Sequence, residues 1–341
     1  MPIITRSAAP VESSDWQQLL AGAFRNSEDL LNYLGLPPDS AISGVARASG
    51  FPVLVPRPYA DQMEHGNPDD PLLRQVLTHS EELVQAPGFV SDPLEEAAAN
   101  KTPGIIHKYR GRVLLLAASG CAVNCRYCFR RHFPYSDNRL SRAQWQQALG
   151  YIENDHSITE VILSGGDPLM LQDKALSELI QHCEAIPHVK RLRIHTRLPV
   201  VIPQRLTESL IRMLCDSRLQ TSIVLHINHA NELSETHRPA LENLRRGGVT
   251  LLNQSVLLRN VNNDFRVLSD LSECLFEFGI MPYYLHLLDR VAGAHHFEVA
   301  EDEAVRLHRS LLNHLPGYLV PRLVREVAGQ ESKAPINLDR L

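Results

Sequence analysis

The sequence predicts an α/β protein: a partial, TIM-like barrel of six β/α units, preceded by a helical region and followed by a short tail. Three observations support this prediction. Short apolar runs rich in β-branched residues recur from residue 112 onward, a helical pattern separates each run from the next, and the polar motifs directly follow the runs. Such alternation is typical of a parallel sheet with right-handed crossovers.

Length and charge narrow the classes of protein that the chain can belong to. The 341 residues suffice for a single α/β barrel with added segments, and a net charge of −5 gives no general attraction to nucleic acid or anionic membranes. The first residues lack the apolar segment of a signal peptide, and the longest apolar run, 113–118, is too short to cross a bilayer. We therefore expect a cytoplasmic protein with neither a nucleic-acid nor a membrane partner. In that reducing compartment, clustered cysteines hold metal or do chemistry more often than they form disulfides.

Residues 1–100 are predicted to form a helical, loop-rich region. Ser14, Ser27 and Asp70 each precede an amphipathic stretch and are candidate N-caps, and a proline at the next position supports the cap at Asp70. Gly35 is the expected stop of the second helix. Because prolines recur between these stretches, we expect short helices that pack on the barrel.

Residues 101–316 are assigned to the barrel and 317–341 to the tail. The predicted strands are short and apolar, at 112–117, 159–164, 190–195, 221–227, 249–255 and 281–288. The predicted helices carry an apolar stripe and lie at 141–154, 173–186, 204–217, 235–248, 264–279 and 301–315.

Polar motifs follow the strands along the whole barrel. A cysteine cluster follows the first strand, and SGGDP (164–168), HTRLP (195–199) and HINHANE (226–232) lie at the ends of the next three. In a barrel of parallel strands the carboxyl ends meet on one rim, where active sites lie. The sequence therefore predicts an active site on that rim.

Cys121, Cys125 and Cys128 are separated by three and two residues. A zinc site usually needs four ligands; His132 is a candidate for the fourth, but the pattern matches no common zinc module. On a 4Fe–4S cluster, three thiolates leave one iron without a protein ligand, free to bind the amino and carboxylate groups of a small molecule. The missing fourth cysteine thus favours an open cluster.

This cysteine spacing after the first barrel strand, with Tyr127 beside the last cysteine, resembles the radical S-adenosylmethionine (SAM) superfamily. The SGGDP segment also fits that resemblance, although taken alone it is an ordinary turn with Asp167 as a helix cap. The resemblance implies SAM contacts from residues on the rim: Ser164, Gly165, Gly166, Asp167, His226 and Gln254.

From about residue 67 onward, the chain resembles lysine 2,3-aminomutase in segment after segment, among them CAVNCRYCFRRHF, RIHTRLPVVIP, LLNQSVLLRNVN and PYYLHLLDRVAGAHHF. In its short length, the chain is most similar to family members whose product modifies elongation factor P. The resemblance implies conversion of L-α-lysine to β-lysine with a 4Fe–4S cluster, SAM and pyridoxal phosphate. It also implies an external electron donor, and a ligase that passes the product to elongation factor P.

The same resemblance assigns roles near the second cofactor and the substrate. Of five lysines, it selects Lys333 as the covalent attachment point of pyridoxal phosphate, although Lys108 is also placed to approach the rim. The remaining assignments are Tyr109 and Arg112 beside pyridoxal phosphate, Arg130 on the substrate carboxylate, and Asp289 and Glu326 on its distal ammonium. Two departures are a GQES segment before Lys333 in place of a run of glycines, and a glutamate at 326 in place of an aspartate.

Other functions remain open from the residues alone. The basic segment CRYCFRRHF also suits a radical SAM enzyme that modifies RNA or a peptide, and a non-catalytic iron–sulfur or zinc scaffold is a third possibility. Larger family members carry a cysteine-rich zinc-binding extension. Because Asp264 stands where a participating cysteine is expected, we predict no structural zinc, and the oligomeric state is left open.

Overall fold

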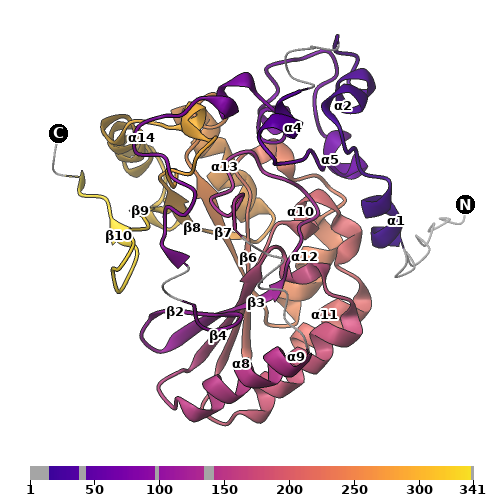
Figure 1. The fold of residues 1–341 in the computed structure, drawn as a ribbon, viewed down its shortest axis with the longest axis vertical. Helices are drawn as coiled ribbons and strands as arrows, with labels where there is room; N and C mark the ends of the chain where they lie inside the picture. Colours follow the sequence, from indigo (N-terminus) through magenta and orange to yellow (C-terminus); the bar gives the residue numbers. More distant parts are fainter. Residues whose placement is uncertain (1–14, 38–43, 97–99, 134–141, 339–341) are drawn as a thin grey trace, which may run out of the picture.

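The computed structural model describes residues 15–37, 44–96, 100–133 and 142–338. Its centre is a ten-stranded sheet whose strands follow one another in sequence order (Figure 1). Seven neighbouring strands run parallel: β3 (Arg112–Ala118), β4 (Glu160–Gly165), β5 (Arg191–Thr196), β6 (Gln220–Leu225), β7 (Thr250–Val256), β8 (Met281–His286) and β9 (Arg322–Arg325). Antiparallel strands flank them: β1 (Asn100–Thr102) and β2 (Ile105–Tyr109) at one edge, β10 (Ala334–Pro335) at the other.

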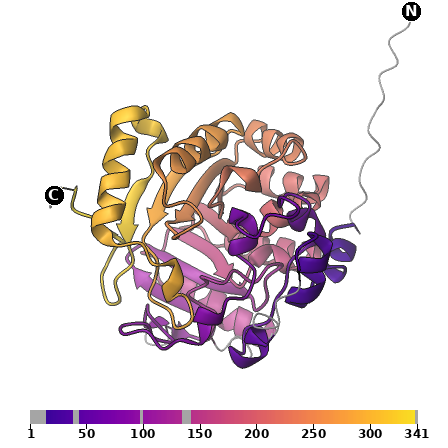
Figure 2. The same ribbon diagram turned by 90° about the horizontal axis from the view of Figure 1, so that it is seen from above.

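The predicted partial barrel is confirmed. Within the described ranges no backbone ladder joins β1 to β10, so the sheet curves without closing. The outer face is covered by helices, which form an arc around the strands in Figure 2. The main covering helices are α8 (Arg142–Asn154), α9 (Asp173–Ala185), α11 (Glu208–Cys215), α12 (Arg238–Arg246), α13 (Phe265–Glu277) and α14 (Glu301–His314).

Strand residues alternate between the helix-covered core and the barrel interior, as the period of two requires. On β5, Leu192 and Ile194 are fully buried in the core, whereas Arg193 and His195 line an internal cavity. The barrel interior is therefore polar on this strand, which suits a binding site better than a packed core.

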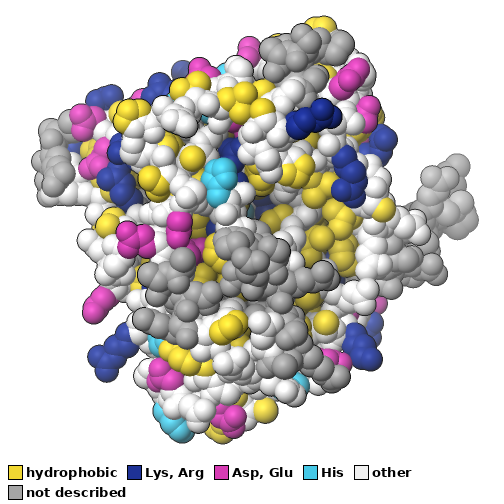
Figure 3. All heavy atoms as spheres, viewed as in Figure 1, with side chains coloured by type: hydrophobic (Ala, Val, Ile, Leu, Met, Phe, Trp, Pro, Cys, Tyr) yellow, Lys and Arg dark blue, Asp and Glu magenta, His cyan; other side chains and the backbone are white. Residues whose placement is uncertain are grey.

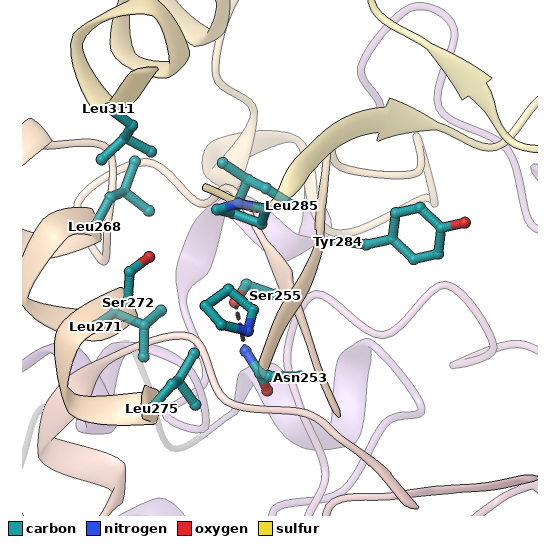
Figure 4. A pocket seen from close by; sticks show the side chains of 11 residues that line it. Asn253, Ser255, Leu268, Leu271, Ser272, Leu275, Tyr284, Leu285 and Leu311 are labelled. Atoms are coloured by element: carbon teal, nitrogen blue, oxygen red, sulfur yellow. Dashed lines mark hydrogen bonds between the residues drawn. The ribbon is translucent and has the colours of Figure 1, made fainter. Parts of the chain in front are cut away.

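The core between sheet and helices is tightly packed. A small void of about 10 Å³ lies between β7, β8, α13 and α14. Figure 4 shows the side chains that line it. Leucines line one side of it, and Asn253 and Ser255, joined by a 2.9 Å hydrogen bond, lie on the other. Such a void has room for about one water molecule. Binding of a larger ligand must therefore take place elsewhere.

The N-terminal region is helical and loop-rich. Its helices are α1 (Asp15–Ala21), α2 (Ser27–Tyr33), α4 (Val45–Ala48), α5 (Arg57–Ala60), α6 (Pro71–Arg74) and the 3-10 helix η1 (Ser80–Leu83). Trp16, Leu30 and Leu72 join the same hydrophobic cluster as barrel residues such as Leu163 and Leu192. The region therefore packs on the barrel, as expected.

Two of the predicted N-caps fall within the described residues. Asp70 caps α6 by accepting from the amides of Leu72 and Leu73, both at 2.8 Å, which confirms that prediction. The prediction for α2 is wrong by one position: Asn26, not Ser27, is the cap. Asn26 has the extended backbone that a cap needs, whereas the hydroxyl of Ser27 is buried against Thr78. The predicted cap Ser14 lies outside the described residues.

Short helices connect the larger elements: α10 (Leu198–Val201), η2 (Pro168–Met170), η3 (Pro203–Arg205), η4 (Ala230–Glu232), η5 (His295–Phe297) and η6 (Gly317–Leu319). The tail continues the sheet, which the sequence pattern did not indicate. Its strand β9 pairs in parallel with β8, and the chain then turns back so that Ala334 of β10 pairs with Arg325. No helix in the described parts of the chain is long and apolar enough to cross a membrane.

Candidate active site

A cavity of about 620 Å³ lies inside the barrel, toward the carboxyl ends of its strands. Every site residue that the sequence predicted lines it: Tyr109, Arg112, Cys121, Cys125, Cys128, Arg130, Ser164, Gly165, Gly166, Asp167, His226, Gln254, Asp289, Glu326 and Lys333. The structure thus brings these residues together, while their individual roles stay predictions.

The cysteine loop follows β3 and is held from outside by the N-terminal region. The amide of Asn124 donates to the carbonyl of Leu54 at 3.0 Å, and the amide of Arg126 donates to the carbonyl of Gln75 at 2.8 Å. A turn within the loop brings the amide of Cys128 to the carbonyl of Cys125 at 3.0 Å. These backbone bonds fix the loop independently of any ligand.

A buried ion-pair cluster anchors that loop on either side of its last cysteine, Cys128. Arg126 Nε donates to Glu82 Oε1 at 2.9 Å, and Arg131 Nη2 donates to Glu82 Oε2 at 2.6 Å. All three side chains are at most 1% exposed. The basic segment that suggested RNA binding is therefore turned inward at these two arginines, which share Glu82 as their counterion.

The three thiols of the loop are free and share the cavity wall. Burial, followed by the charge of Cys128, raises the pKa of Cys121 well above its ordinary value. Burial and the neighbouring Cys125 raise the pKa of Cys128 to about 11. Buried thiols that repel one another as thiolates are stabilised by a bound cation, which deprotonates them. The set therefore fits a cationic iron cluster.

The same thiols do not form a site for a single metal ion. Among the described residues, no group of three or more His, Cys, Asp or Glu side chains is arranged around one point in that way. A cubane cluster needs only one thiolate on each of three irons, so its ligands need not converge on one atom. His132, the alternative fourth ligand, bonds to the carbonyl of Ala292 instead.

A buried arginine stands beside the cysteine loop. Arg197 Nη1 donates to Cys125 Sγ at 2.7 Å and to the hydroxyl of Tyr127 at 2.6 Å. Its Nη2 donates to Glu232 Oε2 at 2.8 Å and to Gln75 Oε1 at 2.8 Å. This network ties the loop to two further strand ends and fixes where Cys125 points.

The SGGDP turn is packed against the loop that leaves β3. A Cβ atom on Gly166 would lie 2.3 Å from the carbonyl oxygen of Gly120, and one on Gly165 would lie 2.5 Å from that of Ala118. Gly165 also has a positive φ of 117°, which favours glycine. Both positions therefore require glycine for the fold itself, whatever ligand approaches them.

Asp167 is committed to the protein. Its Oδ1 accepts from the Thr196 hydroxyl at 2.7 Å and from the amide of Leu169 at 3.0 Å, while Oδ2 accepts from the amides of Arg197 and Leu198 at 2.7 and 2.8 Å. Both carboxylate oxygens therefore act as caps and strand-end anchors. A SAM contact from this residue remains a prediction, and these bonds leave its carboxylate engaged elsewhere.

His226 follows β6, Gln254 lies on the neighbouring strand β7, and both line the cavity. His226 stacks on Tyr127 and places its Nε2 2.8 Å from the Tyr127 hydroxyl. Burial, followed by the charge of Arg197, lowers the pKa of His226 to about 3. The imidazole is therefore neutral at physiological pH and presents a flat, uncharged face to this end of the cavity.

A second group of charges lies at the other end of the cavity. Lys333 Nζ donates to Glu326 Oε2 at 2.6 Å and lies 5.7 Å from the centre of the Tyr284 ring. The Tyr109 hydroxyl donates to Glu326 Oε1 at 3.1 Å, and the Arg112 guanidinium lies 4.5 Å from the Tyr109 ring. Residues far apart in the sequence thus converge on one carboxylate.

This end also has the charges that a phosphorylated aldehyde needs. The Lys333 amine faces the cavity, and the cations Arg112 and Arg322 line it without an ion pair to any described acidic residue. An amine for covalent attachment and guanidiniums for a phosphate fit pyridoxal phosphate.

Asp289 is almost completely buried beside these charges. Burial, followed by the negative charge of Glu326, raises its pKa to about 7. For Glu326 itself, burial favours the neutral form, but the charge and hydrogen bond of Lys333 outweigh it and lower the pKa to about 2. The pair therefore combines one carboxylate that is always ionised with one that titrates near neutrality.

Arg130, predicted to bind a carboxylate, already holds one. Its Nε and Nη2 donate to the two oxygens of Glu96 at 2.7 and 2.8 Å, and Nη1 lies 3.3 Å from both the Ser164 hydroxyl and the Gly165 carbonyl. The two-point fork is the geometry that guanidinium and carboxylate groups prefer. Glu96 therefore occupies this fork, and a substrate carboxylate on Arg130 remains a prediction.

The sequence did not point to Glu96, His195 or Tyr284 as site residues, yet all three line the cavity. For His195 a signal existed, because it opens the HTRLP motif at the end of a predicted strand. Glu96 precedes the first strand and carries no such signal.

On the face drawn in Figure 3, acidic and basic side chains are interspersed rather than gathered into a patch of one sign.

A partial parallel barrel that gathers three thiols in a C-x3-C-x2-C loop after its first parallel strand defines a radical SAM enzyme. Residues 109–196 match the model of a 4Fe-4S single cluster domain. A radical SAM methyltransferase of known structure from Sphaerobacter thermophilus matches with a TM-score of 0.43 at 15% identity, over 66% of this chain and 72% of that one.

Curated relatives identify the family. The L-lysine 2,3-aminomutase of Escherichia coli is 54% identical over 325 residues, 95% of each chain, and that of Haemophilus influenzae is 51% identical over 333 residues, 98% of each. The chain belongs to the L-lysine 2,3-aminomutase family. Its cofactors are accordingly a 4Fe–4S cluster, SAM and pyridoxal phosphate, and it is an isomerase.

Proposed function

We propose that this enzyme converts L-lysine to β-lysine by moving the α-amino group to the neighbouring carbon. The observation that carries the proposal is the single cavity that joins three cysteine thiols to the Lys333–Glu326 pair and to Asp289. The family membership supports the same reaction. A cavity with the three thiols but without the Lys333–Glu326 pair would suit a different radical SAM reaction.

We assign the cofactors to the two ends. Cys121, Cys125 and Cys128 would hold the cluster, and Lys333 would hold pyridoxal phosphate with Tyr109 and Arg112 beside it. SAM contacts are assigned to the rim between these ends: Ser164, Gly165, Gly166, Asp167, His226 and Gln254. When bound, these groups supply hydrogen-atom abstraction and a conjugated carrier for the amino group, and the protein supplies orientation and exclusion of water.

We assign the substrate by charge. Asp289 and Glu326 would bind the distal ammonium, and Arg130 would bind the carboxylate. The 2.6 Å contact from Lys333 Nζ to Glu326 Oε2 supports this, because the ammonium of a lysine side chain fits against that oxygen within the cavity. Two acids at one end favour a basic amino acid over leucine or glutamate, which would leave them unpaired or repel them.

The test is anaerobic incubation of the reconstituted enzyme with L-lysine, SAM and a reductant, followed by mass and chiral analysis of the product. We expect β-lysine from the wild type and from Lys190→Ala, an exposed lysine before β5. Recovery of unchanged lysine from a cluster-loaded wild type would exclude the proposal.

Lys333→Ala separates the two cofactors. We expect it to retain iron and sulfide but to lose the mass increment that borohydride reduction fixes on the wild type. An increment that persists would move the attachment to another lysine, and Lys108, also in the cavity, is the first to examine.

We further propose that the enzyme works in the cytoplasm with an external electron donor, and that its product passes to a ligase acting on elongation factor P. All six cysteines are free thiols, which fits a reducing compartment. The test of the last step is whether purified product is attached to elongation factor P by such a ligase; a ligase that rejects β-lysine would remove this destination.

A further inference from the structure

Lys108 occupies a position between the two charged ends of the cavity. It lies on β2, where Ile106 and Tyr109 also line the cavity, and the pairing of β2 with β3 shifts register between those two residues. Its Nζ lies 3.4 Å from Glu326 Oε1 and 3.6 Å from Glu96 Oε1, and it donates to the carbonyl of Leu94 at 3.3 Å. The side chain is only 15% exposed.

The two acids that Lys108 contacts serve opposite ends of the cavity. Glu96 holds Arg130 through both of its oxygens, and Glu326 holds Lys333. The result is a row of alternating charges: Arg130, Glu96, Lys108, Glu326, Lys333. The row joins the end assigned to the substrate carboxylate with the end assigned to its distal ammonium.

The two oxygens of Glu326 are used differently. Lys108 and the Tyr109 hydroxyl both contact Oε1, at 3.4 and 3.1 Å, whereas Lys333 contacts Oε2. Donors from β2 thus hold one oxygen in place and leave the other directed at a cation in the cavity. A glutamate has one more rotatable bond than an aspartate, so it needs such an anchor to present an oxygen at one defined position.

We propose that Lys108 is a positioning residue that sets the spacing between the carboxylate-binding and ammonium-binding ends of the cavity, and so selects the chain length of the diamino acid substrate. This inference rests on the proposed function. Lys108 does not contact the reacting carbons in this account. It acts through Glu326 and Glu96, whose positions determine where the two ends of the substrate lie.

Removing Lys108 has two opposing electrostatic consequences. The cavity becomes more negative, which maintains or strengthens attraction for lysine, whose two ammonium groups and one carboxylate leave a net positive charge. Glu326 meanwhile loses an anchor, and a misplacement of about 1 Å can cost about 100-fold in rate. The expected signature is therefore a large loss in kcat with little loss in substrate affinity, together with weaker discrimination by chain length.

The experiment compares Lys108→Gln, Lys108→Arg and the control Lys190→Gln with the wild type, all loaded with cofactors and assayed for iron and pyridoxal phosphate content. Turnover is measured with lysine and with ornithine, which is one methylene shorter. Equilibrium dialysis of labelled lysine against the unreduced enzymes measures affinity without turnover. Lysine turnover by wild type and Lys190→Gln tests the proposed function independently of Lys108.

We expect Lys108→Gln to lose about 100-fold in kcat on lysine, to bind lysine within about threefold of the wild type, and to lose about tenfold in its preference for lysine over ornithine. Lys108→Arg, which keeps the charge and can bridge both acids, should recover most of the preference. Unchanged kcat and preference in Lys108→Gln would overturn the inference. Loss of iron or pyridoxal phosphate in both variants would also overturn it, because Lys108 would then be a structural residue.

Discussion

Glu82→Gln is the sharpest test of how the cysteine loop is held. Glu82 is fully buried and accepts from two buried arginines, Arg126 and Arg131, which flank the last cysteine of the loop. Burial favours its neutral form, but the hydrogen bonds and charges of Arg126 and Arg131 outweigh burial and keep the pKa of Glu82 below its ordinary value. The substitution keeps the shape of the side chain and removes its charge, leaving two guanidiniums without a counterion.

The expected cost follows from the geometry. With contacts of 2.9 and 2.6 Å to the two arginines, removing the shared acid leaves uncompensated buried charge, which typically costs about 3–5 kcal/mol. That is a large part of the roughly 5–15 kcal/mol that stabilises a typical folded protein. If the unfolding slope in urea is about 3 kcal/mol/M, the midpoint should fall by about 1–1.7 M.

The assay is anaerobic urea unfolding of the cluster-loaded protein, with iron content measured before each titration. Glu81→Gln is the matched control: Glu81 is half exposed and, within the described ranges, its one ionic contact is with His295, so its loss should cost less than about 1 kcal/mol. We also expect Glu82→Gln to bind less iron, because Arg126 and Arg131 fix the loop that carries the thiols. Equal midpoints for the two variants would refute the argument that this buried cluster anchors the loop.

Two further predictions concern the rim and the substrate end. Gly166→Ala should fold poorly or bind little iron, because its Cβ would lie 2.3 Å from the Gly120 carbonyl oxygen, whereas Gly317→Ala, with no atom within 4 Å of the new Cβ, should match the wild type in thermal unfolding. Asp289, whose pKa is raised to about 7 by burial and by the charge of Glu326, is ionised above pH 7 and neutral below it. We therefore expect kcat/KM for lysine to fall as the pH decreases from 8 to 6. Asp289→Asn should be slow at every pH and should not show this decrease. If the decrease persists in Asp289→Asn, it belongs to another group.

The sequence was sufficient for the barrel because each strand carries two independent signals. A run such as 159–164 is apolar and β-branched, and a glycine-rich polar motif follows it. The observed strand, Glu160–Gly165, differs by a single position. Since motif and strand agree along the chain, the rim could be predicted as well as the strands.

The short tail strand β9, Arg322–Arg325, was missed for a physical reason. Four residues are too few to show a period, and two of them are arginines. Its pairing with β8 comes from tertiary position, because α14 returns the chain to the edge of the sheet. The cap of α2 was misassigned for a related reason: Asn26 and Ser27 are both good caps, and only the burial of Ser27 against Thr78 decides between them.

The charge row through Lys108 is also beyond sequence reasoning. Lys108 and Glu326 are 218 residues apart, and each taken alone is an ordinary charged residue at a strand end. Their contact depends on the antiparallel register of β2 on β3 and on the parallel pairing of β9 with β8. A one-residue slip in either register would turn the side chain to the other face of the sheet.

The contact between Lys108, Tyr109 and Glu326 crosses the open seam of the barrel. β2 belongs to one edge of the sheet, and Glu326 directly follows β9 near the other; Figure 2 shows the C-terminal segment beside the violet edge formed by the first strands. Backbone hydrogen bonds between the two edge strands would close such a seam whatever side chains the strands carried. Here the Lys108–Glu326 ion pair and the Tyr109 hydroxyl bridge it, so the width of the cavity depends on a few side chains. Lys333 lowers the pKa of Glu326 to about 2, so Glu326 stays ionised around neutral pH, where Asp289, with a pKa of about 7, changes ionisation.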